Sequence, residues 1–260
     1  MPPSVGAAAP TLAELYAAHA GKVSQKWRLY LEVYERALRG LREAPIAMVE
    51  VGVQNGGSLE IWAKYFPRAT AIVGCDVDPK CAELRFDDPR IAVVVAPVNT
   101  AAAARAILAR ANPIDVFIDD GSHFSPDIVV AFCNYFPALR PGGLYLAEDL
   151  HAAYRPDFMG GLEAPNAMRF FCALVDGIHH EYWQEQADPG AMLQRFLPAG
   201  AKVDARALVD SIASICFHDS LCIVEKRRSP AEGRLGERVI AGSEALVHPG
   251  VPGMGGLKPV

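Results

Sequence analysis

The strongest constraint on the fold is a regular alternation of short apolar runs and helix-like segments between residues 46 and 147. The apolar runs are almost wholly hydrophobic, as strands are in a parallel sheet that is covered on both faces. The pattern therefore predicts a doubly wound α/β sheet. We expect strands over residues 46–51, 70–75, 91–95, 114–118 and 143–147, with helices over 58–66, 79–84, 100–111 and 126–139.

A second pattern follows the alternation. Residues 211–217 and 221–226 are strand-like, and only His218-Asp219-Ser220 separates them. A link this short permits an antiparallel hairpin and excludes a parallel crossover. The sequence thus predicts a mostly parallel sheet that ends in an antiparallel hairpin.

The segments around the sheet complete the predicted organisation. Residues 1–10 are expected to be disordered, and residues 11–44 to form N-terminal helices with one apolar face. Residues 150–210 break the alternation and directly follow an acidic pair, so we expect a lid or acceptor wall there. A single domain is expected over 11–228, and a Gly- and Pro-rich extended tail over 229–260.

Composition narrows the class of function. The formal net charge is −5, which argues against binding to nucleic acid or to an anionic membrane. The longest uncharged run, residues 91–104, is too short to span a bilayer, and the N-terminus has no secretory pattern. The six cysteines form no CxxC pair, as expected for reduced thiols in the cytoplasm.

A glycine-rich segment follows the first predicted strand and opens a helix. It contains Glu50, Gly52, Asn55, Gly56 and Ser58 in the order E-x-G-x-x-x-G-G, which differs from the G-x-G-x-x-G of dinucleotide binders. Glycines there let the backbone approach a ligand, and the helix N-terminus offers free N–H groups. A tight turn without a ligand remains the alternative.

The second predicted strand ends in an acidic sequence, Gly74-Cys75-Asp76-Val77-Asp78. An acid about 20 residues beyond a glycine-rich loop can bind the hydroxyls of a ribose. A helix cap is the alternative for Asp76, because Asp-x-Asp-Pro also suits a helix start. Both roles fit if Asp76 binds ribose and Asp78 is the cap.

Three acidic side chains follow the fourth and fifth predicted strands. Asp120 lies directly after the fourth, and Glu148 and Asp149 directly after the fifth. If these strands are neighbours, the carboxylates converge and repel one another unless a cation lies among them. Oxygen ligands favour Mg²⁺, and Mn²⁺ or Ca²⁺ would also fit. The alternative is that one or two of these acids cap helices.

A histidine follows Asp120 in the same predicted loop. His123 would lie beside the proposed cation, where it could accept a proton as a general base, and His151 is the next candidate. A hydrogen-bonded structural role for His123 is the alternative.

Taken together, these motifs resemble a known family. The segments EVGVQNGGS, DVFIDDGSH, LRPGGLYLAEDLH and FHDSLCIVEK are similar to class I S-adenosylmethionine-dependent methyltransferases. More narrowly, they resemble the metal-dependent sugar O-methyltransferases of macrolide biosynthesis, of the mycinamicin and macrocin type. The cephalosporin hydroxylase-like group shares much of the pattern. The early segment KWRLYLEVYERAL resembles a KW…Y…Y helix of the sugar O-methyltransferases.

The resemblance implies a Rossmann-like, seven-stranded methyltransferase sheet whose last strand is antiparallel. It also implies S-adenosylmethionine over the loop 50–58, with Asp76 on the ribose and Asn99 near the adenine, and we place Asp119 beside the cofactor as well. Mg²⁺ would be held by the three acids named above, with His123 as the base.

The expected activity is O-methylation of a small natural product, at a hydroxyl of a sugar or another vicinal diol. A homo-oligomer, a dimer or larger, is also expected. Two competing interpretations are a nicotinamide-dependent Rossmann oxidoreductase and a non-methylating, hydroxylase-like member of the family. The missing G-x-G-x-x-G and the terminal hairpin count against the oxidoreductase.

Overall fold

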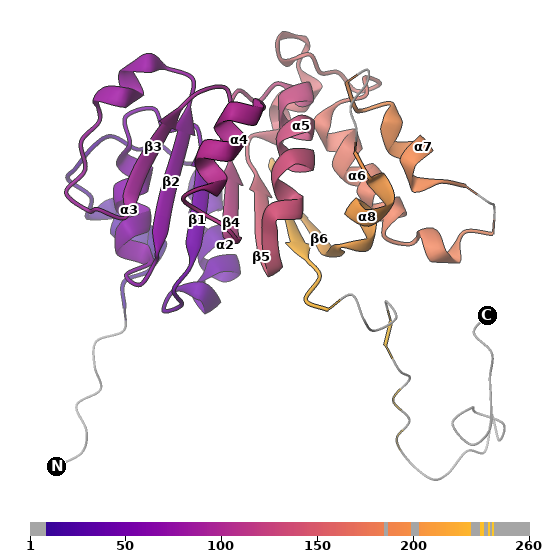
Figure 1. The fold of residues 1–260 in the computed structure, drawn as a ribbon, viewed down its shortest axis with the longest axis horizontal. Helices are drawn as coiled ribbons and strands as arrows, with labels where there is room; N and C mark the ends of the chain where they lie inside the picture. Colours follow the sequence, from indigo (N-terminus) through magenta and orange to yellow (C-terminus); the bar gives the residue numbers. More distant parts are fainter. Residues whose placement is uncertain are drawn as a thin grey trace. The chain divides into compact units, whose positions relative to one another are not determined.

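A single seven-stranded sheet organises the described residues between 9 and 228 (Figure 1). The strand order is β3-β2-β1-β4-β5-β7-β6, and β7 is antiparallel to both of its neighbours. This confirms the predicted doubly wound sheet with a terminal hairpin. The strands are β1 (Ala47–Val51), β2 (Ala71–Asp76), β3 (Ile91–Val95), β4 (Ile114–Asp119), β5 (Leu139–Ala147), β6 (Ile212–His218) and β7 (Leu221–Lys226).

Helices and short 3-10 turns connect the strands and cover the sheet. The α-helices are α1 (Leu12–Ala17), α2 (Arg28–Leu38), α3 (Gly57–Tyr65), α4 (Ala101–Leu108), α5 (Ser125–Tyr135), α6 (Ala167–Gly177), α7 (Pro189–Gln194) and α8 (Ala205–Asp210). The 3-10 helices are η1 (Arg39–Leu41), η2 (Pro79–Glu83), η3 (Phe136–Ala138), η4 (Leu150–Tyr154), η5 (Pro156–Phe158) and η6 (His180–Tyr182).

The computed structural model describes residues 9–184, 187–198, 203–229, 235–236, 239 and 241. The chain divides into two compact units, residues 1–228 and 229–260. The predicted disorder of residues 1–8 and most of the predicted extended tail lie outside the described residues.

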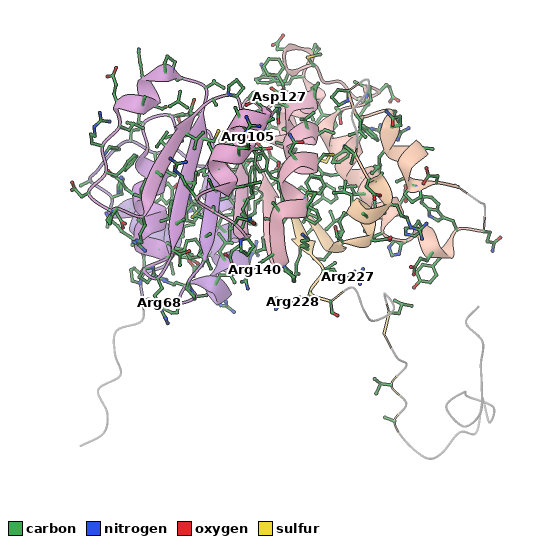
Figure 2. All side chains as sticks on the ribbon, viewed as in Figure 1. Arg68, Arg105, Asp127, Arg140, Arg227 and Arg228 are labelled. Carbon is green, nitrogen blue, oxygen red and sulfur yellow. The ribbon has the colours of Figure 1, made fainter. Side chains whose placement is uncertain are left out.

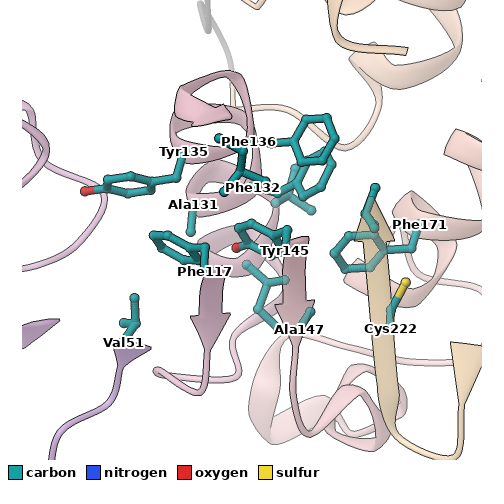
Figure 3. Close-up of a cluster of buried hydrophobic side chains, with 14 of the residues drawn as sticks. Val51, Phe117, Ala131, Phe132, Tyr135, Phe136, Tyr145, Ala147, Phe171 and Cys222 are labelled. Atoms are coloured by element: carbon teal, nitrogen blue, oxygen red, sulfur yellow. The ribbon is translucent and has the colours of Figure 1, made fainter. Parts of the chain in front are cut away.

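The sheet separates two hydrophobic clusters, because successive side chains of a strand point to opposite faces. Val49 and Val51 of β1 belong to the cluster that includes residues of α4, α5, α6 and α8, whereas Met48 belongs to the one beneath α1, α2 and α3. In the first cluster Phe117 stacks on Tyr145 at 4.9 Å between ring centroids (Figure 3).

Part of the predicted lid belongs to this core. Helix α6 buries Phe171 fully and places it in the cluster beside the sheet (Figure 3). Its ring packs edge-on against Phe132 of α5, with centroids 5.5 Å apart. Residues 167–177 therefore cover the sheet.

The predicted N-terminal helices are two, α1 and α2, and a non-helical segment over residues 18–27 joins them. Long-range contacts explain the break: Glu60 accepts hydrogen bonds from the backbone N–H of Lys22 at 2.9 Å and from its Nζ at 2.6 Å. The backbone N–H of Gly57 donates to Val23 O. The segment crosses the start of α3, and these contacts outweigh its local helical tendency.

Four of the labelled arginines gather at one end of the sheet. Figure 2 shows Arg68, Arg140, Arg227 and Arg228 at that end, and Arg105 and Asp127 at the other. The end near Asp127 is where β1, β4 and β5 finish level, since Val51 pairs with Asp119 and Asp119 with Ala147. Among the described residues, no helix has the length and hydrophobicity that crossing a bilayer requires.

Candidate active site at the carboxyl ends of the strands

The glycine-rich loop after β1 touches the loop after β4. Gly52 has a φ of +88°, and a Cβ built on it would lie 1.9 Å from the backbone oxygen of Asp120. Only glycine fits a left-handed position with so close an approach. The contact brings the first predicted site within van der Waals distance of the second, so the two loops form one surface.

A cavity of about 310 Å³ opens beside this contact. That volume lies within the range of small-molecule pockets. Its lining includes five of the predicted site residues: Gly52, Asp76, Asn99, Asp119 and Asp120. The structure thus brings the ends of β1, β2 and β4 together with the loop after β3.

Asp76 is fixed at the mouth of the cavity by backbone groups. Its Oδ2 accepts hydrogen bonds from the N–H groups of Val53 and Gln54 at 2.7 and 2.9 Å. Burial alone would raise the pKa of Asp76, but these donors and the N–H of Asp78 outweigh it, so the pKa lies below its usual value. Asp78 caps η2 by accepting from Lys80 N. Asp76 is therefore ionised and Asp78 is the helix cap.

Two further predicted residues line the same cavity: Asn99, from the loop after β3, and Asp119, from the end of β4. Asn99 Nδ2 donates to Asp127 O and Oδ1, each at 3.2 Å. Asp119 is 4% exposed and accepts a hydrogen bond from the Tyr145 hydroxyl at 2.6 Å. Burial raises the pKa of Asp119 to about 7.

The other residues of the predicted loop lie behind or beside the cavity. Glu50 is fully buried, and it accepts hydrogen bonds from Ser58 Oγ at 2.6 Å and from Trp62 Nε1 at 3.2 Å. Asn55 is exposed, and Gly56 is the N-cap of α3 with a φ of +84°. The pair Glu50–Ser58 thus supports the loop from below, and a direct cofactor contact from these four residues stays a prediction.

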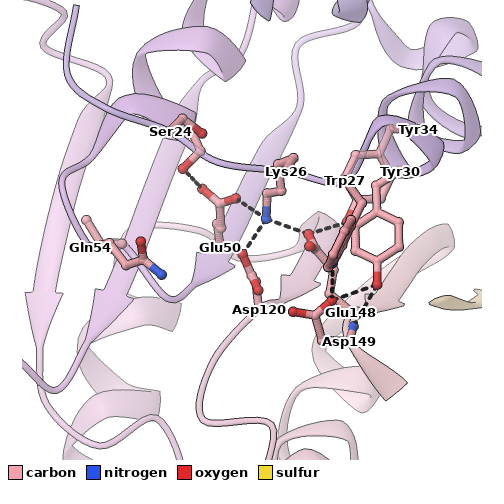
Figure 4. Close-up of polar contacts among 12 residues, drawn as sticks. Ser24, Lys26, Trp27, Tyr30, Tyr34, Glu50, Gln54, Asp120, Glu148 and Asp149 are labelled. Carbon is pink, nitrogen blue, oxygen red and sulfur yellow. Dashed lines mark hydrogen bonds and ion pairs between the residues drawn. The ribbon is translucent and has the colours of Figure 1, made fainter. Parts of the chain in front are cut away.

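An acidic cluster lies next to the cavity, around one buried ammonium group (Figure 4). Lys26 is 3% exposed at its side chain, and its Nζ lies 2.5 Å from Asp120 Oδ2 and 2.6 Å from Glu148 Oε1. Glu50 Oε1 lies 3.5 Å from the same nitrogen. The hydroxyl of Tyr34 donates to Glu148 Oε1. Two of the three predicted acids, Asp120 and Glu148, therefore share a cation that the chain itself supplies.

The third predicted acid is held by different donors. Asp149 has a φ of +52°, and its Oδ1 accepts hydrogen bonds from the Tyr30 hydroxyl at 2.8 Å and from Trp27 Nε1 at 3.1 Å. The Tyr30 oxygen also accepts from the backbone N–H of Asp149 at 3.1 Å. Aspartate tolerates a left-handed backbone better than most residues, and such strain is found at functional sites.

His123 completes the cluster. Its Nε2 lies 3.5 Å from Asp149 Oδ2 and 3.8 Å from Asp120 Oδ1. Ligand atoms of Asp120, His123 and Asp149 all lie within 4.8 Å of one another. His123 also has a positive φ, of +57°. His151, the second candidate base, is about half exposed and is hydrogen-bonded through Nδ1 to Ser220 Oγ at 2.6 Å.

The charges of the cluster do not balance. Three carboxylates, those of Glu50, Asp120 and Glu148, lie around one ammonium group. The fourth, Asp149, has no ammonium neighbour among the ion pairs described and faces His123 instead. Burial lowers the pKa of Lys26, but its three carboxylate neighbours outweigh burial and raise that pKa well above its usual value. Lys26 is therefore charged. Burial, with repulsion from Asp120, keeps the pKa of Glu148 above its usual range despite Lys26.

Such an excess of oxygen ligands fits a further, hard cation.

Lys26, Tyr30 and Tyr34 were not among the predicted site residues. Their pairing with Asp120, Glu148 and Asp149 joins positions about 100 or more residues apart, which no local pattern reveals. The one signal that could have found them is the KW…Y…Y spacing, which places Tyr30 and Tyr34 four residues apart on one face of α2, shortly after Lys26.

Comparisons with known proteins agree with this geometry. Residues 49–150 match a family described as a methyltransferase domain. The 8-demethyl-8-alpha-L-rhamnosyl tetracenomycin-C 2'-O-methyltransferase of Streptomyces olivaceus is 35% identical over 235 residues, which are 86% of this chain and 57% of that protein. Mycinamicin VI 2''-O-methyltransferase of Micromonospora griseorubida is 35% identical over 160 residues, which are 57% of this chain and 39% of that protein.

A solved structure is similar as well. MycE methyltransferase from the mycinamycin biosynthetic pathway, in complex with Mg, SAH and mycinamycin VI, matches with a TM-score of 0.68 and 28% identity. The match covers 86% of this chain and 55% of that one. The chain thus spans about half the length of the relatives it matches. The resemblance to sugar O-methyltransferases that the motifs indicated is confirmed.

Proposed function

We propose, from the methyltransferase domain that residues 49–150 carry, that this chain is an S-adenosylmethionine- and Mg²⁺-dependent O-methyltransferase. The observation that carries the proposal is that Asp120, which lines the cavity together with Gly52 and Asp76, also gathers with His123 and Asp149 in one cluster of possible metal ligands. The acceptor would be a hydroxyl of a glycosylated natural product, by analogy with the relatives named above.

The cavity fits S-adenosylmethionine by its volume and its groups. The ionised Asp76 would accept hydrogen bonds from the ribose hydroxyls, and Asn99 would lie near the adenine. Gly52 permits the backbone to approach the ligand because it carries no Cβ. Asp119 would contact the cofactor from the floor of the cavity.

The acidic cluster fits a divalent cation. Asp120, Glu148 and Asp149 would hold it, because each of these carboxylates uses one oxygen in the bonds described above and keeps the other. Oxygen ligands of this kind prefer Mg²⁺, with Mn²⁺ or Ca²⁺ as substitutes. When bound, S-adenosylmethionine supplies an activated methyl group and Mg²⁺ supplies a Lewis acid that lowers the pKa of a hydroxyl.

His123 is the proposed general base. Its Nε2 faces Asp149 Oδ2 at 3.5 Å, at the edge of the cluster where an acceptor hydroxyl would lie. When the acceptor and S-adenosylmethionine are bound, His123 would take the proton of the acceptor hydroxyl. Asp120 and Asp149 flank the imidazole at 3.8 and 3.5 Å.

A second cavity, of about 480 Å³, is the proposed acceptor site. Trp27, Tyr30, His151 and Ser220 line it. The side chain of Trp27 is 61% exposed, and its Nε1 reaches Asp149. The ring could pack against the apolar face of a sugar and direct its hydroxyls toward His123. A cytoplasmic location and a homo-oligomer stay predictions from the sequence.

Methyl transfer to sugar hydroxyls tests the proposal. The chain is incubated with S-adenosylmethionine, Mg²⁺ and either mycinamicin VI or a rhamnosylated tetracenomycin, and mass spectrometry measures the addition of a methyl group. We expect transfer to one of these glycosides, its loss in EDTA and its recovery with Mg²⁺. Full activity in EDTA would remove the metal from the mechanism. Calorimetric binding of NAD in place of S-adenosylmethionine would contradict the proposal altogether.

A further inference from the structure

Four side chains of the segment 26–34 donate hydrogen bonds to the carboxylates of the acidic cluster (Figure 4). We propose that they are positioning residues for the divalent ion: they hold one oxygen of each metal-binding carboxylate and leave the other oxygen for the ion. This inference rests on the proposed function, and it concerns residues that the proposed function leaves unassigned. We call these four residues the positioning set: Lys26, Trp27, Tyr30 and Tyr34.

Two of the carboxylates are held on the inner side of the cluster. Asp120 is bound through Oδ2 by Lys26, and Glu148 is bound through Oε1 by Lys26 and by the Tyr34 hydroxyl. Across the described residues, no hydrogen bond engages Asp120 Oδ1 or Glu148 Oε2. These hydrogen bonds therefore fix the rotamer of each carboxylate. They also determine which of its two oxygens stays available for the ion.

The third carboxylate is held in the same way from the outer side. Asp149 is bound through Oδ1 by Tyr30 and Trp27, and its Oδ2 faces His123. Within the described part of the chain, no hydrogen bond engages Oδ2. Each of the three carboxylates thus presents one bound and one unbound oxygen, which is the arrangement expected when donors outside the ligand sphere orient metal ligands.

Three of the four residues of the positioning set are packed and therefore rigid. The side chain of Lys26 is 3% exposed, Tyr30 is 1% exposed and Tyr34 is fully buried, whereas Trp27 is 61% exposed. Tyr34 also packs against Trp62 of α3, with ring centroids 5.7 Å apart. Ordering these donors costs nothing further when the ion binds, so their loss should weaken the ion's binding directly.

Metal affinity, measured without catalysis, tests the inference. The variants Tyr30→Phe and Tyr34→Phe each remove one hydroxyl and keep the ring that packs in the core. Isothermal titration calorimetry measures Mn²⁺ binding to the full chain with S-adenosylhomocysteine present. We expect each variant to bind Mn²⁺ about 10- to 100-fold more weakly than the unmodified chain, the usual effect of losing a group that orients a metal ligand.

Tyr16→Phe is the matched control. Tyr16 precedes the same segment, and its hydroxyl is 3.1 Å from Ser24 Oγ rather than bonded to an acid of the cluster. We expect this variant to keep its affinity for Mn²⁺. Affinity for S-adenosylhomocysteine, measured without metal, should be the same in all variants, and thermal melting reports whether each is folded.

The outcomes separate the two proposals. If the unmodified chain binds Mn²⁺ and both tyrosine variants bind it within about threefold of that affinity, the positioning inference is overturned and the proposed function stands. If the unmodified chain binds no Mn²⁺, the metal-dependent function itself fails. An equal loss in Tyr16→Phe would show a general effect of the segment and would also overturn the inference.

Discussion

Replacing Lys26 with methionine should destabilise the protein strongly in the absence of divalent ions. Methionine keeps most of the side chain's length and volume, so the change removes the charge more than the packing. It leaves Glu50, which is fully buried, and Glu148, which is 1% exposed, without their shared cation. Removing one partner of a buried ion pair costs about 3–5 kcal/mol, because the remaining charge is buried and unpaired.

Urea unfolding of Lys26→Met in EDTA measures this loss, and for a chain of this size it corresponds to a fall in Tm of roughly 6–20 °C. The double variant Lys26→Met with Glu148→Gln also lacks one of the orphaned carboxylates. We expect it to be less destabilised than the sum of the two single variants by about 1 kcal/mol or more. A loss below about 1 kcal/mol in Lys26→Met, or strict additivity in the double variant, would refute the assignment of Lys26 as the counter-charge of the cluster.

Three further substitutions test the separate parts of the site. His123→Ala should lower kcat by about 100-fold or more and leave S-adenosylhomocysteine affinity unchanged, as calorimetry can show; a small effect would move the base to His151. Asp76→Ala should weaken S-adenosylhomocysteine binding at least about tenfold, since the proposed hydrogen bonds to the ribose are lost. Its affinity for Mn²⁺ should be unchanged. Gly52→Ala should lower the free energy of unfolding by about 1–2 kcal/mol from its left-handed backbone alone, and the clash with Asp120 should lower it further. A variant that unfolds at the same urea concentration as the unmodified chain would contradict this geometry.

Most of the sheet was predictable because its signals are local. Short apolar runs that alternate with helix-like segments indicate covered parallel strands, and a three-residue link between two strands makes them antiparallel, so β1 to β5 and the hairpin β6–β7 follow from the sequence. The carboxyl ends of adjacent parallel strands meet, which is why the proximity of Asp120 and Asp149 was predictable too.

The break between the N-terminal helices was not predictable in this way. The apolar spacing is helical throughout, but the chain leaves the helix at residue 18 to reach Glu60 and the start of α3. Those contacts lie nearly 40 residues away in sequence, and local periodicity carries no information about them. For the same reason Lys26 was missed: a lysine between two helices is usually a solvated charge, and only the fold shows that it is buried among three carboxylates.

The positive φ values of His123 and Asp149 were likewise invisible in the sequence. Both residues follow strands in loops whose course is set by contacts with other loops rather than by their own turn chemistry. The two side chains face each other, with His123 Nε2 3.5 Å from Asp149 Oδ2. Left-handed backbone at two facing side chains is consistent with the functional roles proposed for both.

An anomalous diffraction map of crystals soaked with Mn²⁺ and S-adenosylhomocysteine tests the central claim most directly. The account predicts one strong peak bound by oxygens of Asp120, Glu148 and Asp149, with the sulfur of the ligand in the adjoining cavity and His123 beside the peak. A map with no peak among these carboxylates, or with Lys26 still filling the only space between them while the ligand is bound, would contradict it.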